Sequence, residues 1–353
     1  MSEKLELAGK DFYAAIQAVM RFPAVGSFEG AGLIHLEVVE TSLVVTRQGI
    51  ALSVASVPIA SGSLKLCAVD EKQISGFSSL CAEAARVVIE SGEEIKFRCR
   101  GRETTAPKAK GIEYRMPTLA KKQRIKGSAE LAERINYLAA LALEDDTRPE
   151  VSCVMLRGDG RAAAVNQRMM AVFDLAKEVP RAALPIQLAK VFQADDSFEF
   201  NNELTLLHSG CAIHCMPSPA KALKDFPLDL VDAYAQLPRS LVAVCRGEDL
   251  ARVVGECDMV LGQLAKTALV LTVTVKGGKL QISSENGAAR FRAVIACPGK
   301  TLEGATIKLP AEEMTRLSEF IAKELQVKLY LDKKNGASFL TLDIGSVAFP
   351  SYR

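Results

Sequence analysis

Three amphipathic helices at nearly equal spacing are the feature of this sequence that most constrains its fold. Apolar residues recur every three or four positions over 10–20, over 128–143 after a capping serine, and over 248–261. The helices begin near residues 10, 128 and 247, so their starts are 118 and 119 residues apart, and a third of the 353-residue chain is about 118 residues. This spacing predicts a threefold internal repeat.

A second helix and a set of short strands follow in each third. The second helices are predicted over 70–80, 185–193 and 310–325, with Pro185 and Pro310 at the first helical position of the last two. Strands are predicted at 33–39, at 151–156 and 162–173 around a turn at 157–160, and at 269–275 and 280–284 around a turn at 276–279. The predicted class is α+β: three similar domains, each with two helices packed on antiparallel sheet, over 1–122, 127–240 and 241–353.

The composition is typical of a soluble globular protein. Hydrophobic residues make up 49% and charged residues 24% of the chain, which argues against disordered and fibrous classes. Apolar runs are short and the N-terminus lacks the pattern of a secretory signal, so we expect a cytoplasmic protein that is not associated with a membrane. Nine scattered cysteines, an odd number, are expected to be reduced and mostly buried.

Charge is distributed unevenly along the chain. The net charge is +2, but the segment 98–126 holds ten Lys or Arg against two acids and carries +8, which leaves −6 elsewhere. A mildly acidic body with a local basic surface could meet a polyanion such as nucleic acid. The alternative interpretation of the segment is a solvated linker.

No catalytic or metal-binding motif is evident. The three histidines lie in strand-like alternation, Pro298-Gly299-Lys300-Thr301 lacks the first glycine of a phosphate-binding loop, and Cys211 and Cys215 are placed on the opposite strand face from His214. Asp145-Asp146 and Asp195-Asp196 follow predicted helices and are expected to be exposed turn residues. We therefore expect no catalytic residues, no metal and no cofactor, and a hydrolase with an unrecognised carboxylate site is the least favoured alternative.

Three motifs, in order along the repeat, resemble one family. Residues 146–151 (Asp-Thr-Arg-Pro-Glu-Val) and 163–172 resemble an Arg-containing turn and a strand ending in a T-D-G-H-R-L-A-like segment, although 166–171 differs at most positions. Phe226-Pro227 and 234–238 are similar to an F-P-x-Y-x-x-x-L-P signature with extra residues inserted, and 347–353 resembles a V-x-M-P-M-R-L ending. The family is the bacterial sliding clamp, the β subunit and processivity factor of DNA polymerase III, of which this chain resembles a divergent member.

The resemblance implies a homodimer joined head to tail, with six similar domains in a ring, helices inside and sheets outside. A ring that slides needs phosphate contacts without base readout, so the cations of the helices would face duplex DNA in a sequence-independent way. By family position for Lys72 and by helical phase for the others, the DNA-facing residues would be Lys10, Arg21, Lys72, Arg134, Lys190, Arg252, Arg316 and Lys323. Ordinary solubilising charges are the alternative for each residue.

Two further sites are implied by the resemblance. One is a groove between domains two and three that docks short peptide motifs of a DNA polymerase and a clamp loader, formed by Val151, Val165, Arg168, Met170, Pro227, Val347, Phe349, Pro350 and Tyr352. The other is the dimer interface, at which Tyr114 and Met116 of domain one would face Val260 and Leu261 of domain three. Plain core residues are the alternative for the groove.

The function that the resemblance implies is non-enzymatic. The chain would encircle duplex DNA and confer processivity on a replicative polymerase during DNA replication. A clamp-like adaptor or decoy, which binds clamp partners without encircling DNA, is the alternative from the class of binding proteins.

Overall fold

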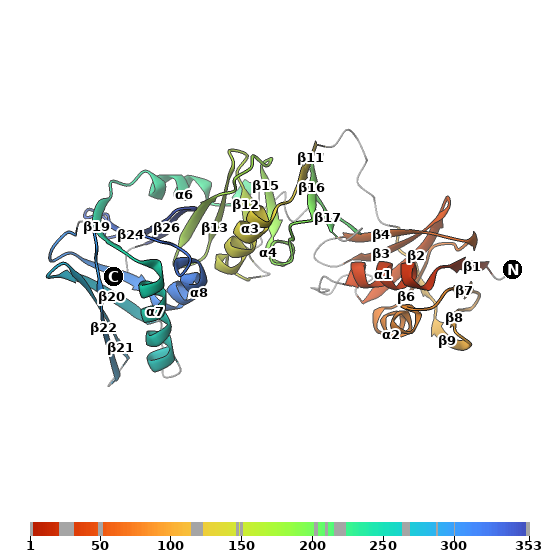
Figure 1. The fold of residues 1–353 in the computed structure, drawn as a ribbon. Coiled ribbons are helices and arrows are strands. Elements are labelled where there is room, and N and C mark those ends of the chain that lie inside the picture. The colour runs from red at the N-terminus through yellow and green to blue at the C-terminus, as the bar shows by residue number, and fades with distance from the viewer. Residues whose placement is uncertain are drawn as a thin grey trace. The chain divides into compact units, whose positions relative to one another are not determined.

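The computed structural model describes the chain except for a set of short segments, and it divides the chain into two compact units. The segments left out are 1–2, 21–31, 49–51, 114–122, 146–147, 149–150, 201–203, 209–210, 215–223, 263–268, 287–288, 300 and 351–353. Unit 1 comprises Met1–Ala129 and Phe192–Ser218, and unit 2 comprises Glu130–Val191 and Pro219–Arg353. Each unit is described by itself below (Figure 1).

The described helices, with the exception of α6, begin close to the positions that the sequence predicts. They are α1 (Gly9–Met20), α2 (Glu71–Cys81), α3 (Ala129–Leu141), α4 (Ile186–Ala189), α6 (Leu228–Ala235), α7 (Gly247–Leu261) and α8 (Ala311–Ile321). The side chain of Asp70 caps α2 by accepting hydrogen bonds from the backbone N–H groups of Lys72 and Gln73, at 3.0 and 3.1 Å. None of these helices is long and apolar enough to cross a membrane.

Unit 1 contains two antiparallel sheets and the helix pair α1 and α2. The five-stranded sheet has the order β5 (Ser61–Gly62), β1 (Glu3–Leu7), β7 (Val87–Ser91), β8 (Glu94–Cys99) and β9 (Arg102–Pro107). The nine-stranded sheet has the order β10 (Ala109–Lys110), β6 (Cys67–Asp70), β2 (Leu33–Val39), β3 (Ser42–Gln48), β4 (Leu52–Pro58), β18 (Cys211–His214), β17 (Leu204–His208), β16 (Ser197–Phe200) and β11 (Gln123–Lys126).

The core of unit 1 joins both helices to a sheet through three aromatic rings. Phe12 on α1, Phe77 on α2 and Phe97 on β8 have ring centroids between 5.3 and 6.4 Å apart. Figure 1 shows α1 and α2 among the strands of unit 1. All three side chains are buried, so this cluster fixes the helix pair to the sheet.

Unit 2 also contains two antiparallel sheets, together with α3, α4, α6, α7 and α8. The eight-stranded sheet has the order β15 (Ala182–Pro185), β12 (Cys153–Leu156), β13 (Arg161–Val165), β14 (Met170–Asp174), β26 (Gly345–Phe349), β25 (Ser338–Leu342), β24 (Val327–Leu331) and β19 (Ser240–Cys245). The four-stranded sheet has the order β22 (Ala289–Ala296), β21 (Lys279–Asn286), β20 (Val270–Lys276) and β23 (Thr306–Pro310).

Two strand pairings determine how the middle third of the chain is divided between the units. Strand β18 pairs with β4 of the first third, and β14 pairs with β26 of the last third. The later strands of the middle third therefore extend a sheet of unit 1, whereas its earlier strands extend a sheet of unit 2.

A glycine lies at or just before the first helix of each third. Gly9, Gly127 and Gly247 are 118 and 120 residues apart, and each donates its N–H to a carbonyl that follows the second helix of the same third, at 3.1, 2.7 and 3.2 Å. A Cβ at any of the three would lie within 2.7 Å of a backbone oxygen. The three thirds therefore repeat the same close approach between the start of one helix and the end of the other.

Several sequence expectations need correction. The helix predicted at 185–193 is only four residues long, and Pro185 and Pro310 are N-caps, each preceding the first helical residue. The run 162–173 is two strands, β13 and β14. Asp196 is 2% exposed, not an exposed turn residue, and its carboxylate accepts a hydrogen bond from the N–H of Gln193 at 2.7 Å. Helix α6 was not predicted.

The linker interpretation of the basic segment is wrong for its described part. Residues 98–110 lie mainly in β8, β9 and β10, and 123–126 form β11, whereas 114–122 lie outside the described residues. Arg98 pairs with Glu90 and Glu103, and Arg100 pairs with Glu83, so acids compensate part of the +8 charge.

The described cysteines are free thiols and mostly buried, as predicted. Cys297 is half-buried and the others are buried: Cys67, Cys81, Cys99, Cys153, Cys245 and Cys257.

Candidate partner-docking face, helix cations and sheet edges

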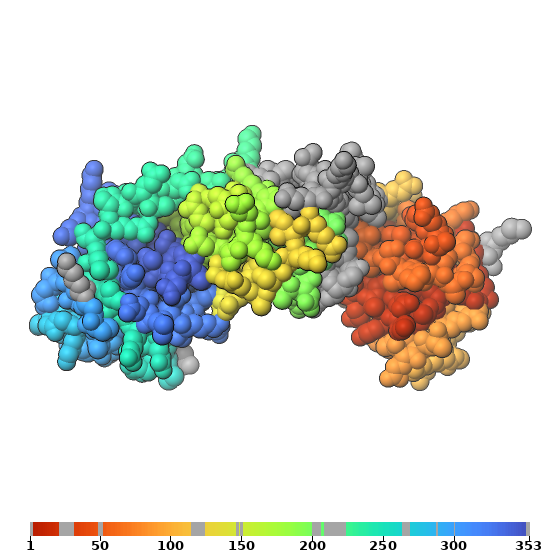
Figure 2. Space-filling model, turned by 45° about the horizontal axis from the view of Figure 1, so that its top comes forward, coloured from red at the N-terminus to blue at the C-terminus, as the bar shows by residue number. Residues whose placement is uncertain are grey.

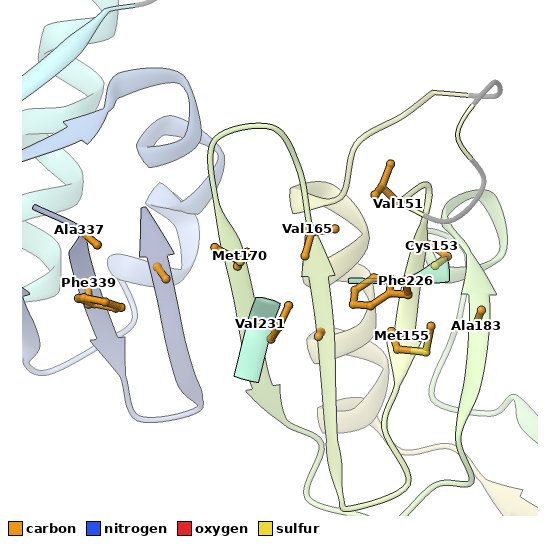
Figure 3. Close-up of a cluster of buried hydrophobic side chains, with 12 residues drawn as sticks. Val151, Cys153, Met155, Val165, Met170, Ala183, Phe226, Val231, Ala337 and Phe339 are labelled. Atoms are coloured by element: carbon orange, nitrogen blue, oxygen red, sulfur yellow. The ribbon is translucent and has the colours of Figure 1, made fainter. Parts of the chain in front are cut away.

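One face of the eight-stranded sheet in unit 2 carries a continuous apolar surface. The register places Val165 opposite Met170, Met170 opposite Ala348, and Ala348 opposite Phe339, so four side chains form a row across β13, β14, β26 and β25. We call this surface the docking face; it consists of Val151, Cys153, Met155, Ala163, Val165, Met170, Ala183, Ala337, Phe339 and Ala348. Figure 3 shows these side chains across both parts of the sheet.

Three of the predicted groove residues belong to the docking face, and two others lie on the far side of the sheet. Val151, Val165 and Met170 are 6%, 4% and 5% exposed within it. Val347 and Phe349 are fully buried, but side chains alternate along a strand and Ala348 between them belongs to the docking face. Strand β26 therefore contributes Ala348 to this face in place of Val347 and Phe349.

Two further predicted groove residues, Pro227 and Pro350, lie at the margins of the docking face. Pro227 is the half-buried N-cap of α6, and Pro350 is half-buried directly after β26. Tyr352 lies outside the described residues.

Arg168 forms an ion pair with a helix of the last third. The side-chain oxygen of Asn166 accepts hydrogen bonds from the N–H groups of Arg168 and Met169, at 2.8 and 2.9 Å, and this turn ends β13 and starts β14. The Arg168 guanidinium donates to Glu312 on α8 at 3.0 Å and lies 3.8 Å from the carboxylate of Glu313. Arg168 thus links the turn to the first turn of α8.

Glu313 predicts a pH dependence of stability. The residue is 3% exposed, and burial raises the pKa of its carboxyl above the ordinary value. Since the folded pKa is raised, the folded state binds the proton more tightly, and stability falls as the pH rises from the unfolded to the folded pKa. Glu313→Gln is therefore expected to raise the melting temperature at about pH 8. This gain should be a few degrees larger than the change in melting temperature that the same substitution causes at about pH 4.5. The exposed neighbour change Glu312→Gln, which removes an ion pair instead, is the control, and an equal gain for Glu313→Gln at both pH values would contradict the prediction.

The segment that carries α6 covers the docking face. Phe226 and Val231 are 5% and 2% exposed in the same apolar cluster, and Leu228, Tyr234 and Leu237 pack against it. Figure 3 shows Val231 over β13 and β14, near Met170 and Phe226. Figure 2 shows this segment at the surface, where atoms of the middle third meet atoms of the last third. The opposite face of the sheet meets α8, because Phe173 on β14 contacts Phe320 at a centroid distance of 6.1 Å.

Phe339 and Ala348, which belong to this surface, and Phe226, which covers it, were not predicted from the sequence as site residues. The alternation along 345–349 offered a signal for Ala348, because it divides that strand into two faces. Phe339 is placed by the antiparallel register of β25 on β26, which sequence alone does not fix.

All five of the predicted DNA-facing cations in unit 2 have acidic partners. Lys190 pairs with Glu144 at 2.8 Å, Arg252 with Glu256 at 2.8 Å and Arg316 with Glu312 at 2.7 Å. Arg134 pairs with Glu130 and also donates to the carbonyl of Asp174, and its side chain is only 14% exposed. These contacts reduce the positive charge that the helices present.

Lys323 joins α8 to α3. Its ammonium donates to Glu133 and, at 2.9 Å, to the hydroxyl of Tyr137, and these hydrogen bonds raise the pKa of Lys323 above its ordinary value.

The predicted DNA-facing cations of unit 1 differ from those of unit 2. Lys10 and Lys72 are exposed, and among the described residues no acidic side chain lies within ion-pair distance of either, whereas Arg21 lies outside the described part of the chain.

Of the predicted dimer-interface residues that the structure describes, one is exposed and the other is buried. Tyr114 and Met116 lie outside the described residues. Val260 is 51% exposed, whereas Leu261 is fully buried in the core and presents no surface. Its neighbour Met259 is 78% exposed, and Val294 on β22, a strand that contacts α7, is 57% exposed. Strands β22 and β9 are two of the eight described strands that end a sheet.

Within the described part of the chain, no three His, Cys, Asp or Glu side chains are grouped so that they could hold a metal ion.

The comparisons with known proteins identify the fold. No protein-family model and no curated protein matches the sequence. Solved structures match over the full length, and the class of fold that they define is the DNA clamp. A protein described as a DNA polymerase III β subunit from Eubacterium rectale has a TM-score of 0.78 at 11% identity, over 99% of this chain and 100% of that chain.

Two further structures agree with this match. The DNA polymerase III β subunit from Pseudomonas aeruginosa has a TM-score of 0.75 at 12% identity over 100% of each chain. The Helicobacter pylori β clamp bound to a DNA ligase peptide has a TM-score of 0.69 at 11% identity, over 99% of this chain and 100% of that chain. This chain has the fold of the bacterial sliding clamp, and the resemblance seen in the motifs is confirmed for the fold.

Proposed function

We propose that this chain is a DNA sliding clamp, a non-catalytic processivity factor that encircles duplex DNA and holds a replicative polymerase. The observation that carries the proposal is the docking face, which is built across the β14–β26 pairing of the middle and last thirds within a full-length clamp fold. The Helicobacter pylori clamp, which has the same fold, is bound to a DNA ligase peptide. By analogy, the docking face receives short apolar motifs of a polymerase and a clamp loader.

The repeat and the sheet edges support a ring of two chains. The threefold glycine pattern favours three similar domains, 1–122, 127–240 and 241–353, as the repeating unit. Strand β22, with the exposed Val294, Met259 and Val260 near it, offers an apolar edge to β9 of a second copy. Such a head-to-tail contact is heterologous, and two copies close into a ring if the rotation between them is a half turn.

The sharpest test of the function is topological retention on DNA. The protein loaded on nicked circular duplex DNA should stay bound through gel filtration at about 150 mM salt, and linearising the DNA should release it, because only a closed ring is held by topology. Equal retention on both DNA forms would favour simple electrostatic association and contradict encirclement.

A charge-reversal pair tests the DNA-facing side of the helices. Lys10→Glu combined with Lys72→Glu is expected to weaken binding and lower the salt dependence of binding by about four phosphate contacts per ring, two from each copy. Lys276→Glu combined with Lys279→Glu changes the net charge equally in an exposed hairpin and is the matched control. If both pairs weaken binding equally, the helices do not face the DNA.

One observation favours the adaptor or decoy as a second candidate. Five of the seven predicted DNA-facing cations among the described residues have acidic partners, so unit 2 presents little net positive charge from its helices. An adaptor would bind clamp partners through the docking face but show no retention on circular DNA.

A further inference from the structure

The two helices of the last third carry a net negative charge. Helix α7 holds four acids and one arginine, and α8 holds three acids and one arginine, which gives net charges of −3 and −2. In unit 1, α1 and α2 each hold one lysine and one acid and are neutral. A duplex lined with phosphates is therefore repelled more by the helices of the last third than by those of unit 1.

Each helix of the last third places its arginine between two glutamates. We call each set of three an acidic stripe; the stripes are Glu248, Arg252 and Glu256 in α7, and Glu312, Arg316 and Glu319 in α8. Their members are three or four positions apart, so they lie on one side of the helix, and all are exposed or half-buried. Each arginine pairs with one glutamate, at 2.8 Å in α7 and 2.7 Å in α8. Within the described part of the chain, the other glutamate of each stripe has no basic partner.

The net charge of the stripes matters more than the ion pairs. Exposed ion pairs at this spacing are weak, so a phosphate could take the place of a glutamate at either arginine. The glutamates would then remain about one helical turn away, roughly 5 Å along the axis. At about 150 mM salt the screening length is about 8 Å, so their charge still acts on the phosphate. Two carboxylates against one guanidinium leave each stripe with a charge of −1, which repels it.

The lysines of α1 and α2 lie in a different environment. The carboxylate of Glu71, next to Lys72, is held by Arg47 of β3 at 2.7 Å. Asp11 follows Lys10 directly, and adjacent residues of a helix do not face each other. Both lysines are exposed, and no acid among the described residues lies within ion-pair distance of either. The two lysines can therefore bind phosphate without displacing a carboxylate.

We propose that the glutamates of the acidic stripes keep the last third from binding DNA, so that the helices contact phosphates through Lys10 and Lys72 of unit 1. This inference rests on the proposed function, because it assigns which helices of the clamp contact the duplex. The glutamates act through the neighbouring arginines and limit how many phosphates the ring holds. Retention on DNA then depends on topology more than on charge.

The test removes the glutamates and the arginines separately. It follows binding to a labelled linear duplex of about 30 base pairs by fluorescence anisotropy at several salt concentrations. The first variant combines Glu248→Gln, Glu256→Gln, Glu312→Gln and Glu319→Gln. We expect it to bind more tightly and to steepen the salt dependence by about two to four phosphate contacts per ring, because the arginines of both copies become available. The second variant combines Arg252→Gln and Arg316→Gln, and we expect its salt dependence to equal that of the unaltered protein.

Four exposed glutamates outside the stripes provide a matched control with the same change of net charge. The control variant combines Glu93→Gln, Glu94→Gln, Glu285→Gln and Glu303→Gln. Its salt dependence should stay unchanged. Equal steepening in the control and the stripe variant would show that net charge alone acts, and a shallower salt dependence in the arginine variant would show that the arginines already bind phosphate. Either result would overturn the inference.

Retention on nicked circular DNA separates this inference from the proposed function. Retention of the unaltered protein, with no steepening in the stripe variant, would overturn the inference alone. Steepening without retention would overturn encirclement, while the role of the glutamates stands. No binding to the linear duplex by any of these proteins at about 50 mM salt would overturn both.

Discussion

Gly247→Ala is expected to lower the free energy of unfolding of unit 2 by about 3 kcal/mol, because a methyl group has no space there. A Cβ at this position would lie 1.7 Å from the carbonyl oxygen of Ile321 and 2.5 Å from that of Glu324. Both are backbone atoms at the end of α8, so relief requires that α7 and α8 move apart. The move would also weaken the hydrogen bond from the N–H of Gly247 to Glu324, which is 3.2 Å long.

The same helix provides a matched control. Gly255 lies within α7 and a Cβ there meets nothing within 4 Å, so Gly255→Ala is expected to stabilise the protein by up to about 1 kcal/mol through helix propensity. Urea unfolding followed by circular dichroism, together with hydrogen exchange of α7 and α8, measures both changes. Equal stability of the two variants would show that the contact between α7 and α8 is not tight.

Met259→Asp combined with Val260→Asp is expected to convert a dimer into a monomer. The two side chains are 78% and 51% exposed at the end of α7, and in the proposed ring they would be buried against a second copy. A charge in the core of an interface costs about 2 kcal/mol or more, and both interfaces of the ring carry both changes, so the dissociation constant should rise by about a thousandfold for each of the two interfaces. Sedimentation at micromolar concentration measures the shift, and retention on circular DNA should be lost with it.

Leu325→Asp tests whether any exposed apolar residue has this effect. Leu325 is 85% exposed and follows Glu324, whose carbonyl contacts the first residue of α7, so it lies near the opposite end of that helix. A helix of 15 residues is about 22 Å long, which separates Leu325 from Met259. We expect Leu325→Asp to leave the dimer intact, and dimers that persist in the Met259 and Val260 variant would contradict the proposed edge.

The helices were predictable because their signals are local. A period of 3.6 residues with a capping or opening residue locates α1, α2, α3, α7 and α8 within a few residues of their structural bounds. Helix α4 is the exception, because the apolar pattern continues to Phe192 although the helix ends at Ala189. Phe192 instead stacks on Phe198 of β16 at a centroid distance of 4.5 Å, a tertiary contact that local periodicity does not contain.

A turn at Asn166, closed by the backbone hydrogen bond from its N–H to the carbonyl of Met169 at 3.0 Å and by its side chain, divides 162–173 into two strands. The side-chain oxygen of Asn166 accepts hydrogen bonds from the N–H groups of Arg168 and Met169, whereas the flanking residues are apolar enough to suggest one strand. The glycine repeat at 9, 127 and 247 was a usable signal, since its spacing matches that of the helices. Only the backbone contacts explain why glycine is required there.

The sequence by itself predicted a threefold repeat and determined the α+β class and the resemblance to a clamp, because these depend on periodicity and motif order along the chain. The tertiary structure decided which side chains share the docking face and what covers it. In β12 all four residues are buried, since the sheet is covered on both sides, so no alternation of apolar and polar residues distinguishes its faces. Assigning Ala348 to the docking face, and Val347 and Phe349 to the helix side, required the register of strands from two distant parts of the chain.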